Sequence, residues 1–235
     1  MGLTSSYTSS PVGRLIVSAG PDLASLDRWI REFARVIEVH QGFLTELDSA
    51  IGDADHGTNM RRGMSAVVTS LDAAAARSES PETALAMFKS VGMTLVSTVG
   101  GASGPLYGTF FLRMATASGD VVAMSATEFA TVLQAGLAGI VQRGKPEAGD
   151  KTMYDSLLPA CTALDASLAA GLDLDQALTA ASAAADAGRD ATTSMQAHKG
   201  RASYLGERSI GHQDPGATSA ALLVAAAVTA FRQPE

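Results

Sequence analysis

Apolar residues recur at helical spacing along most of the chain. In the segment after residue 22, Leu26, Ile30 and Phe33 follow one another at intervals of three or four, which places their side chains on one face of a helix. Similar runs return between breaks rich in glycine, proline and charged residues, whereas no segment shows the alternation of a half-buried strand. The pattern predicts eight helices. The first runs from 22 into the turn after 47, and the second from 56 to just before 80. The next three span 81–99, 103–118 and 126–142, the sixth starts at 152, the seventh runs from 173 toward 198, and the eighth spans 217–231.

Two prolines add detail to these predicted helices. Ser80 followed by Pro81 is typical of a helix start, with serine as the cap and proline at the first helical position, so we expect the third helix to begin there. Pro159 lies inside the sixth predicted helix, where a missing N–H and a crowded ring predict a bend.

Helices joined by short connections alternate in direction, so the sequence predicts an all-α, single-domain barrel or bundle of eight antiparallel up-down helices. We assign this domain to residues 22–235 and interpret residues 1–21, rich in Ser, Thr, Gly and Pro, as an N-terminal tail or leader. Every second connection then lies at the same end of the bundle. The four connections at that end are polar and glycine-rich, which predicts a site there.

The first of these connections carries three aspartates, Asp48, Asp53 and Asp55, within eight positions. Carboxylates this close repel one another unless a cation lies between them, and Mg²⁺ and Ca²⁺ prefer such oxygen ligands. The helix start that follows offers free backbone N–H groups that suit an anion. The other interpretation is a solvated turn capped by its own aspartates. We favour a divalent metal beside a nucleotide polyphosphate.

The other three connections supply further candidates, each with a plainer alternative. The glycine loop at 100–105 lets backbone N–H groups approach an anion, or it merely ends one helix. Lys151 could meet a phosphate or lie exposed in solvent, and Met153 could flank a base. Arg201 suits bidentate phosphate binding. The turn at 214–216 lines a nucleotide pocket or simply precedes the last helix.

Composition narrows the class of protein. The chain has 235 residues, of which 46% are hydrophobic and 17% charged, and a formal net charge of −7, which argues against a nucleic-acid partner. One cysteine excludes an internal disulfide and a cysteine-based metal cluster. We find no secretory signal and no apolar run long enough to span a membrane, so we expect a cytoplasmic protein with no membrane partner.

Five motifs together resemble the nucleotide-binding L subunits of bacterial dihydroxyacetone kinases. They are GDADHGTNM at 52–60, GGASGPLYG at 100–108, GDKTM at 149–153, GRASYLG at 200–206 and DPGA at 214–217. The resemblance covers roughly residues 22–232, in order and with compatible spacing. One departure is Thr58, where a member of the family has an apolar residue.

The resemblance implies a barrel of eight antiparallel helices with ADP, or ATP, and two Mg²⁺ at one end. It assigns the metal ligands to Asp48, Asp53 and Asp55, and these three aspartates with Arg201 as the catalytic set. The nucleotide contacts that it implies are His56, Gly57, Thr58, Asn59, Ala102, Ser103, Gly144, Met153, Arg201, Asp214, Pro215 and Gly216.

The resemblance also implies partners. A separate K subunit holds dihydroxyacetone covalently, and a phosphohistidine-carrying M subunit of the sugar phosphotransferase system recharges the bound ADP in one branch of the family. In the other branch ATP exchanges, and the acceptor could be another short ketose such as erythrulose. A nucleotide-binding regulatory module that contacts a transcription regulator, and a helical metal-binding protein without nucleotide, remain as alternatives of other classes. The oligomeric state stays open, a homodimer included.

Overall fold

A computed structural model of the protein describes residues 19–232. Residues 1–18 and 233–235, and with them most of the expected leader, lie outside the described residues. The described part contains eight α-helices: α1 (Leu23–Ile51), α2 (His56–Ala76), α3 (Ala84–Thr98), α4 (Ser103–Ser118), α5 (Ala126–Gly144), α6 (Met153–Ala169), α7 (Leu174–Ala191) and α8 (Pro215–Phe231). Two short 3-10 helices, η1 (Thr192–Ser194) and η2 (Arg201–Ser209), lie between α7 and α8.

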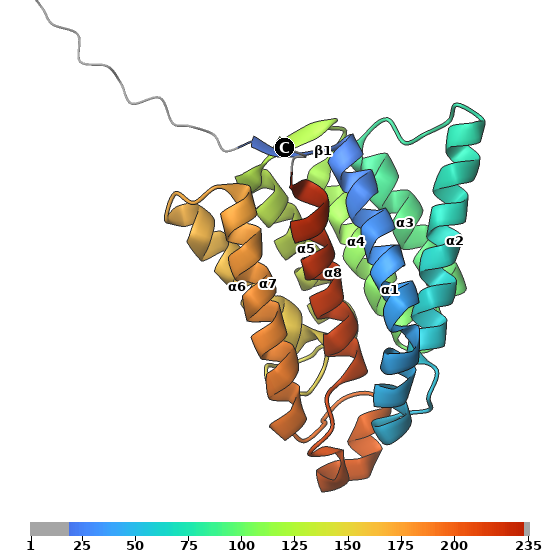
Figure 1. Cartoon of the computed structure of the whole chain (residues 1–235), viewed down its shortest axis with the longest axis vertical. Helices are drawn as coiled ribbons and strands as arrows, with labels where there is room; N and C mark the ends of the chain where they lie inside the picture. Colours follow the sequence, from blue (N-terminus) through green and yellow to red (C-terminus); the bar gives the residue numbers. More distant parts are fainter. Residues whose placement is uncertain (1–18, 233–235) are drawn as a thin grey trace, which may run out of the picture.

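The helices run alternately down and up (Figure 1). Each helix packs against the next in chain order, and α8 packs against both α7 and α1, which closes the barrel. The all-α class predicted from the sequence is therefore confirmed. Because the directions alternate, the connections after α1, α3, α5 and α7 meet at the lower end in Figure 1.

An aromatic cluster at the upper half of the barrel holds the helices together. Trp29 of α1 is fully buried, and its ring lies 6.3 Å from that of Phe88 in α3 and 5.7 Å from that of Phe129 in α5. Its indole Nε1–H donates to the backbone oxygen of Leu223 in α8 at 2.9 Å. One side chain thus joins helices from both ends of the chain.

The structure contains a short antiparallel pair of strands that the sequence pattern did not predict. β1 (Ala19–Asp22) pairs with β2 (Ala123–Ser125) at the upper end of the barrel (Figure 1). Four and three residues are too few to show an alternating pattern, so the expectation of no strands was wrong here. The boundary at residue 22 stays a prediction.

The third helix begins later than predicted. Its cap is Thr83, whose side chain accepts the backbone N–H of Ala86, so the predicted start at Ser80 and Pro81 was wrong. The backbone N–H groups of Ala84 and Leu85 donate to carbonyls of the α4–β2 connection, at Val121 and Gly119. These distant partners fix the first turn, and residues 77–83 form a connection instead.

The seventh helix ends earlier than predicted. It stops at Ala191 and does not extend toward residue 198, so this prediction was also wrong. Thr192 is buried, and its hydroxyl accepts the backbone N–H of Asp214 at 3.0 Å, which turns the chain into the long α7–α8 connection. The helix α6 continues through Pro159, and the bend expected there stays a prediction. Within residues 19–232 no helix is both long and apolar enough to cross a membrane.

Candidate functional site

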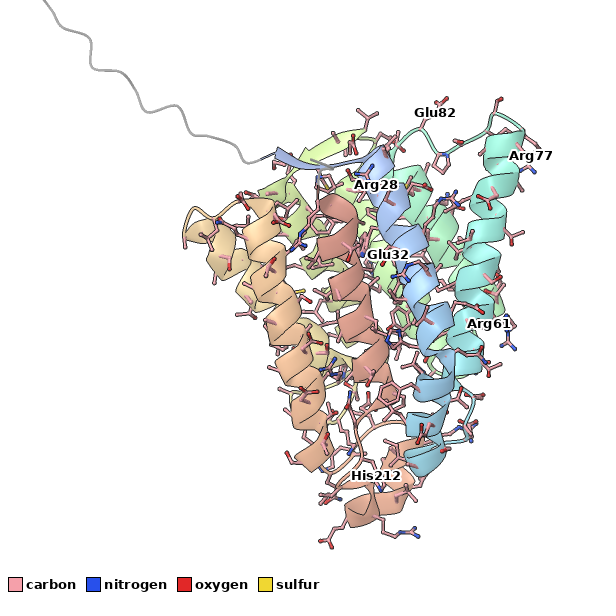
Figure 2. The ribbon with its side chains drawn as sticks, viewed as in Figure 1. Arg28, Glu32, Arg61, Arg77, Glu82 and His212 are labelled. Atoms are coloured by element: carbon pink, nitrogen blue, oxygen red, sulfur yellow. The ribbon has the colours of Figure 1, made fainter. Side chains whose placement is uncertain are left out.

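A cavity of about 500 Å³ lies at the lower end of the barrel, where the four connections meet. Figure 2 shows His212 at this end, among the connections that surround η2, whereas Arg77 and Glu82 lie at the opposite end. Each of the four connections contributes to the cavity wall. Thirteen of the fifteen residues assigned from the sequence line it: Asp48, Asp53, Asp55, His56, Asn59, Ala102, Ser103, Gly144, Met153, Arg201, Asp214, Pro215 and Gly216.

Three carboxylates form the acidic side of the cavity. Each of Asp48, Asp53 and Asp55 has one carboxylate oxygen that lies within 4.8 Å of an oxygen of each of the other two. Asp48 is buried in the last turn of α1, and its Oδ2 accepts the backbone N–H groups of Asp55 at 2.8 Å and His56 at 3.0 Å. The side chain at the end of α1 therefore shapes the turn that carries the other two carboxylates.

The turn between these aspartates is tight. Ala54 adopts a φ of 60°, in the left-handed region that costs a residue with a Cβ some strain. At Gly52, an added Cβ would lie 2.0 Å from Oδ1 of Asp48, so only glycine fits beside that carboxylate. A strained turn that brings three like charges together is a costly arrangement unless it serves binding.

The donor set fits Mg²⁺. All three ligating groups are hard carboxylate oxygens, and Mg²⁺ in proteins binds through one or two carboxylates together with substrate phosphates and water. Asp53 is the most exposed of the three, whereas Asp48 is the most buried, and all three line the cavity. The residues present can therefore hold a divalent cation at the acidic side of the cavity.

His56, the first residue of α2, is buried and bonded through both ring nitrogens. Its Nδ1 lies 3.1 Å from Oγ of Ser103, and its Nε2 lies 3.0 Å from Oγ of Ser219 in α8. The phenol of Tyr107 lies 2.8 Å from the same Ser219 oxygen. Burial lowers the pKa of His56, so its imidazole is neutral at pH 7. The chain of polar contacts fixes Ser103 at the start of α4, facing the cavity.

The glycine loop before α4 is shaped by close packing and by backbone conformation. Gly101 adopts a φ of 64°, which suits glycine alone without strain. A Cβ on Gly104 would lie 2.3 Å from the backbone oxygen of Val99. The positive φ of Gly101 and the close approach of Gly104 to Val99 keep the loop narrow. Ala102 and Ser103 line the cavity next to it, at the start of α4, where an anion can approach backbone N–H groups.

The α5–α6 connection, together with residues of α4 and α5, forms a mixed wall that also includes the polar residues Arg143, Lys151 and Thr152. Gly144 and Met153 line the cavity as expected from the sequence. Leu106, Ile140 and Pro146 join them. Apolar side chains next to polar loops are typical of a site for a base or another planar ring.

The α7–α8 connection closes the cavity from the other side. Arg201, at the start of η2, reaches the acidic turn, and its Nη2 lies 2.9 Å from Oδ2 of Asp53. Asp214 caps α8 by accepting the backbone N–H of Ala217 at 2.6 Å. Burial raises the pKa of Asp214 to about 7 despite this hydrogen bond. A cation, Arg201, and a buried acid with a raised pKa, Asp214, therefore line the cavity together with the three carboxylates.

Two residues assigned from the sequence do not line the cavity. A Cβ on Gly57 would lie 2.1 Å from the backbone oxygen of Gln41, so this glycine lets α2 approach α1. Thr58 is exposed, and its hydroxyl accepts a hydrogen bond from the Gln41 amide at 3.4 Å. Their expected nucleotide contacts, like the other individual contacts, stay predictions.

Sequence reasoning missed the roles of Lys151, Tyr107 and Ser219. Lys151 was expected at a phosphate or in solvent, but it is 1% exposed and bonds to backbone carbonyls. Ser219 interrupts an alanine-rich apolar helix, and a hydroxyl at such a position is a signal that a buried polar partner exists. No pattern in the sequence pointed to its particular partners.

Comparison with known proteins matches residues 50–229 to the DAK2 domain family. The chain is 48% identical over 191 residues to the protein of Escherichia coli (strain K12) named PEP-dependent dihydroxyacetone kinase, ADP-binding subunit DhaL, an alignment that covers 81% of this chain and 89% of the relative. It is 45% identical over 196 residues to PEP-dependent dihydroxyacetone kinase 1, ADP-binding subunit DhaL, of Listeria innocua, covering 83% of this chain and 90% of the relative. The resemblance drawn from the motifs is confirmed.

A solved structure has the same arrangement of helices. The crystal structure of the dihydroxyacetone kinase from C. freundii in complex with AMP-PNP and Mg²⁺ aligns with a TM-score of 0.65 and 25% sequence identity. The alignment covers 97% of this chain and 38% of that kinase, so this chain spans well under half of its length.

Proposed function

The chain belongs to the DAK2 domain family, and on that basis we propose that it is the nucleotide-carrying phosphoryl-transfer subunit of a dihydroxyacetone kinase. The observation that carries the proposal is a single cavity with opposite chemistry on its two sides. Three carboxylates lie on the α1–α2 connection, and Arg201 reaches toward them from the α7–α8 connection. A metal–nucleotide complex offers matching groups for both sides.

Each part of the cavity has a role in this proposal. Asp48, Asp53 and Asp55 hold Mg²⁺, which when bound neutralises charge on the phosphates. The backbone of Ala102 and Ser103 and the guanidinium of Arg201 bind phosphate oxygens, and the wall around Met153 receives the base. These groups align the phosphoryl group and offset its charge, which is the main requirement of phosphoryl transfer.

The acceptor comes from another protein. His56 is not placed to act as the base for a sugar hydroxyl, because both of its ring nitrogens are bonded to serine hydroxyls. We therefore propose that a separate K subunit presents dihydroxyacetone at the mouth of the cavity. The Escherichia coli relative, whose name describes a subunit, supports a division of the enzyme between chains.

We further propose that the bound ADP, held with two Mg²⁺, is rephosphorylated by a phosphohistidine-carrying M subunit, and that the protein works in the cytoplasm. The names of the two relatives, which include the words PEP-dependent, support this donor. In the alternative proposal, ATP is the phosphoryl donor and replaces ADP in the same cavity by exchange.

One experiment separates these donors. The pure protein is loaded with unlabelled ADP, dialysed against Mg²⁺ buffer, and then incubated with radiolabelled ATP. ADP that survives dialysis and resists exchange supports the phosphoprotein donor, whereas rapid exchange supports ATP as donor. A protein that takes up neither nucleotide in the presence of Mg²⁺ contradicts the proposed function.

A further inference from the structure

Lys151 is a buried cation in the α5–α6 connection, next to Thr152, the residue that caps α6. Its side chain is 1% exposed, and its backbone φ of 63° lies in the left-handed region. Residues keep such a conformation where the surrounding contacts fix it. A buried lysine must have hydrogen-bond partners for its ammonium group.

The partners of Lys151 are three backbone carbonyls of the α7–α8 connection. Its Nζ donates to Met195 at 3.1 Å, to Ser209 at 2.6 Å and to His212 at 2.5 Å. An ammonium group has three hydrogens, and all three are used. Lys151 borders the cavity, but while these three bonds are intact none of its hydrogens is left for a phosphate.

These carbonyls lie at the two ends of one loop, residues 195–212, which we call the Arg201 segment. Met195 is on the incoming arm, and Ser209 and His212 are on the outgoing arm. Two further hydrogen bonds join the arms: the N–H of Ala197 donates to Oγ of Ser209 at 2.9 Å, and the N–H of Gly211 donates to the backbone oxygen of Thr193 at 2.8 Å. The ammonium group of Lys151 thus ties the base of the loop to the barrel.

Apart from this base, the Arg201 segment has few attachments to the barrel. Two of them are side-chain contacts, the exposed Arg201–Asp53 ion pair and the contact of His198 Nδ1 with Asp150 Oδ1 at 3.4 Å. The segment's apolar contacts are a small cluster in which Ala197 and Ala202 pack against Ile51 at the end of α1, separate from the main core. The backbone N–H of His198 also donates to the backbone oxygen of Asp150, the neighbour of Lys151. A segment with so little buried apolar surface opens easily unless polar contacts hold it.

We propose that Lys151 is a positioning residue whose ammonium group holds both arms of the Arg201 segment and thereby keeps Arg201 at the cavity. Its effect on phosphoryl transfer rests on the proposed function. The hydrogen bonds by which Lys151 holds the segment do not rest on the proposed function, because their effect can be measured in protein that contains no nucleotide.

Hydrogen–deuterium exchange of the nucleotide-free protein tests whether Lys151 holds the Arg201 segment. In Lys151→Met we expect exchange in residues 195–212 to rise by about tenfold or more, while α4 and α8 stay protected. Lys151→Arg, which keeps a buried cation with several donors, should restore part of the protection. Lys89→Met, an exposed lysine on α3, is the matched control and should leave the exchange unchanged. Unchanged exchange in Lys151→Met, or an equal rise throughout the barrel, overturns the proposal.

Kinetics test the consequence for Arg201. If Lys151 acts through Arg201, Lys151→Met lowers kcat for phosphoryl transfer, and adding Lys151→Met to Arg201→Gln causes little further loss. Multiplicative losses in the double variant overturn the positioning role. If the wild-type protein binds no nucleotide, the proposed function fails, and the exchange experiment still decides whether Lys151 holds the segment.

Discussion

Arg201 and Asp53 form an ion pair across the mouth of the cavity, with Nη2 of Arg201 2.9 Å from Oδ2 of Asp53. The pair joins the basic α7–α8 connection to the acidic α1–α2 turn. The side chains are 66% and 35% exposed, so the pair is weak and can open when a ligand competes for either partner. The same guanidinium can therefore leave Asp53 and bind phosphate when a metal takes its place.

Arg201→Gln should have opposite effects on metal binding and on phosphoryl transfer. Without nucleotide, Asp53 loses its competing cation, so the affinity for Mg²⁺ should rise, by no more than about fivefold because the pair is exposed. Phosphoryl transfer should fall by about a thousandfold, because a fixed positive charge on the phosphoryl group is lost. Calorimetry with Mg²⁺ and a transfer assay measure the two effects. A fall in Mg²⁺ affinity contradicts the competition.

Gly52→Ala should damage the metal site without removing a ligand. The new methyl group would lie 2.0 Å from Oδ1 of Asp48, so that carboxylate must move away from the turn. A displaced ligand or supporting contact typically lowers metal affinity by about 10–100-fold, which calorimetry with Mg²⁺ measures.

Gly42→Ala is the matched control, because a Cβ at that exposed position of α1 meets nothing within 4 Å. It should leave the Mg²⁺ affinity unchanged and stabilise the helix by about 0.5–1 kcal/mol. Equal Mg²⁺ affinities in the two alanine variants would show that Asp48 does not bind the metal.

Ser219 and Tyr107 should be energetically coupled. Ser219→Ala leaves two buried groups, the His56 ring and the Tyr107 hydroxyl, each without this partner, and should lower the free energy of unfolding by about 2–4 kcal/mol. Tyr107→Phe should cost about 1 kcal/mol. Because part of the Ser219→Ala penalty is the unpaired phenol, the double variant should cost less than the sum of the two, by at least about 0.5 kcal/mol. Urea denaturation of the wild type, the two single variants and the double variant measures this difference. Strictly additive losses in the free energy of unfolding would contradict the coupling of Ser219 and Tyr107.

Asp214 should make the stability of the nucleotide-free and metal-free protein depend on pH. Burial raises its pKa from 3.8 to about 7. Between these values the folded state binds a proton that the unfolded state has released, so this contribution to stability is fully present below about pH 4 and is lost as the pH rises through 7.

Asp214→Asn removes this dependence and keeps an oxygen for the N–H of Ala217. Relative to the variant, the wild type should lose stability between pH 5 and 7 at a slope of at most about 1.4 kcal/mol per pH unit, and the difference should level off above 7. The measurement is chemical denaturation of both proteins across this range. Parallel curves would mean that Asp214 is charged throughout.

The sequence alone predicted the barrel and the end of it at which the cavity lies, because these depend on local and periodic signals. The apolar spacing of Leu26, Ile30 and Phe33 corresponds to buried positions of α1. Alternating helices then bring every second connection to one end, which places Asp48 and Arg201 at the same cavity although they are far apart in the chain.

Features fixed by distant backbone partners could not be predicted in this way. Ser80 and Thr83 are both good helix caps locally, and the structure selects Thr83 because Ala84 donates to Val121 in another connection. Lysine is ordinarily exposed, and nothing near Lys151 in the sequence indicates the carbonyls that surround it. Their positions, 44 to 61 residues further along the chain, are set only by the folded α7–α8 connection.

In the proposed function the acidic turn holds the metal of a metal–nucleotide complex, so loss of a carboxylate there should abolish nucleotide retention. The direct measurement is the ADP content of purified protein after extensive dialysis with Mg²⁺ or with a chelator, for the wild type and for Asp53→Ala. We predict that the wild type retains ADP only with Mg²⁺ and that Asp53→Ala retains none under either condition. Normal ADP content in Asp53→Ala, or retention by the wild type that is indifferent to Mg²⁺, would contradict the claim.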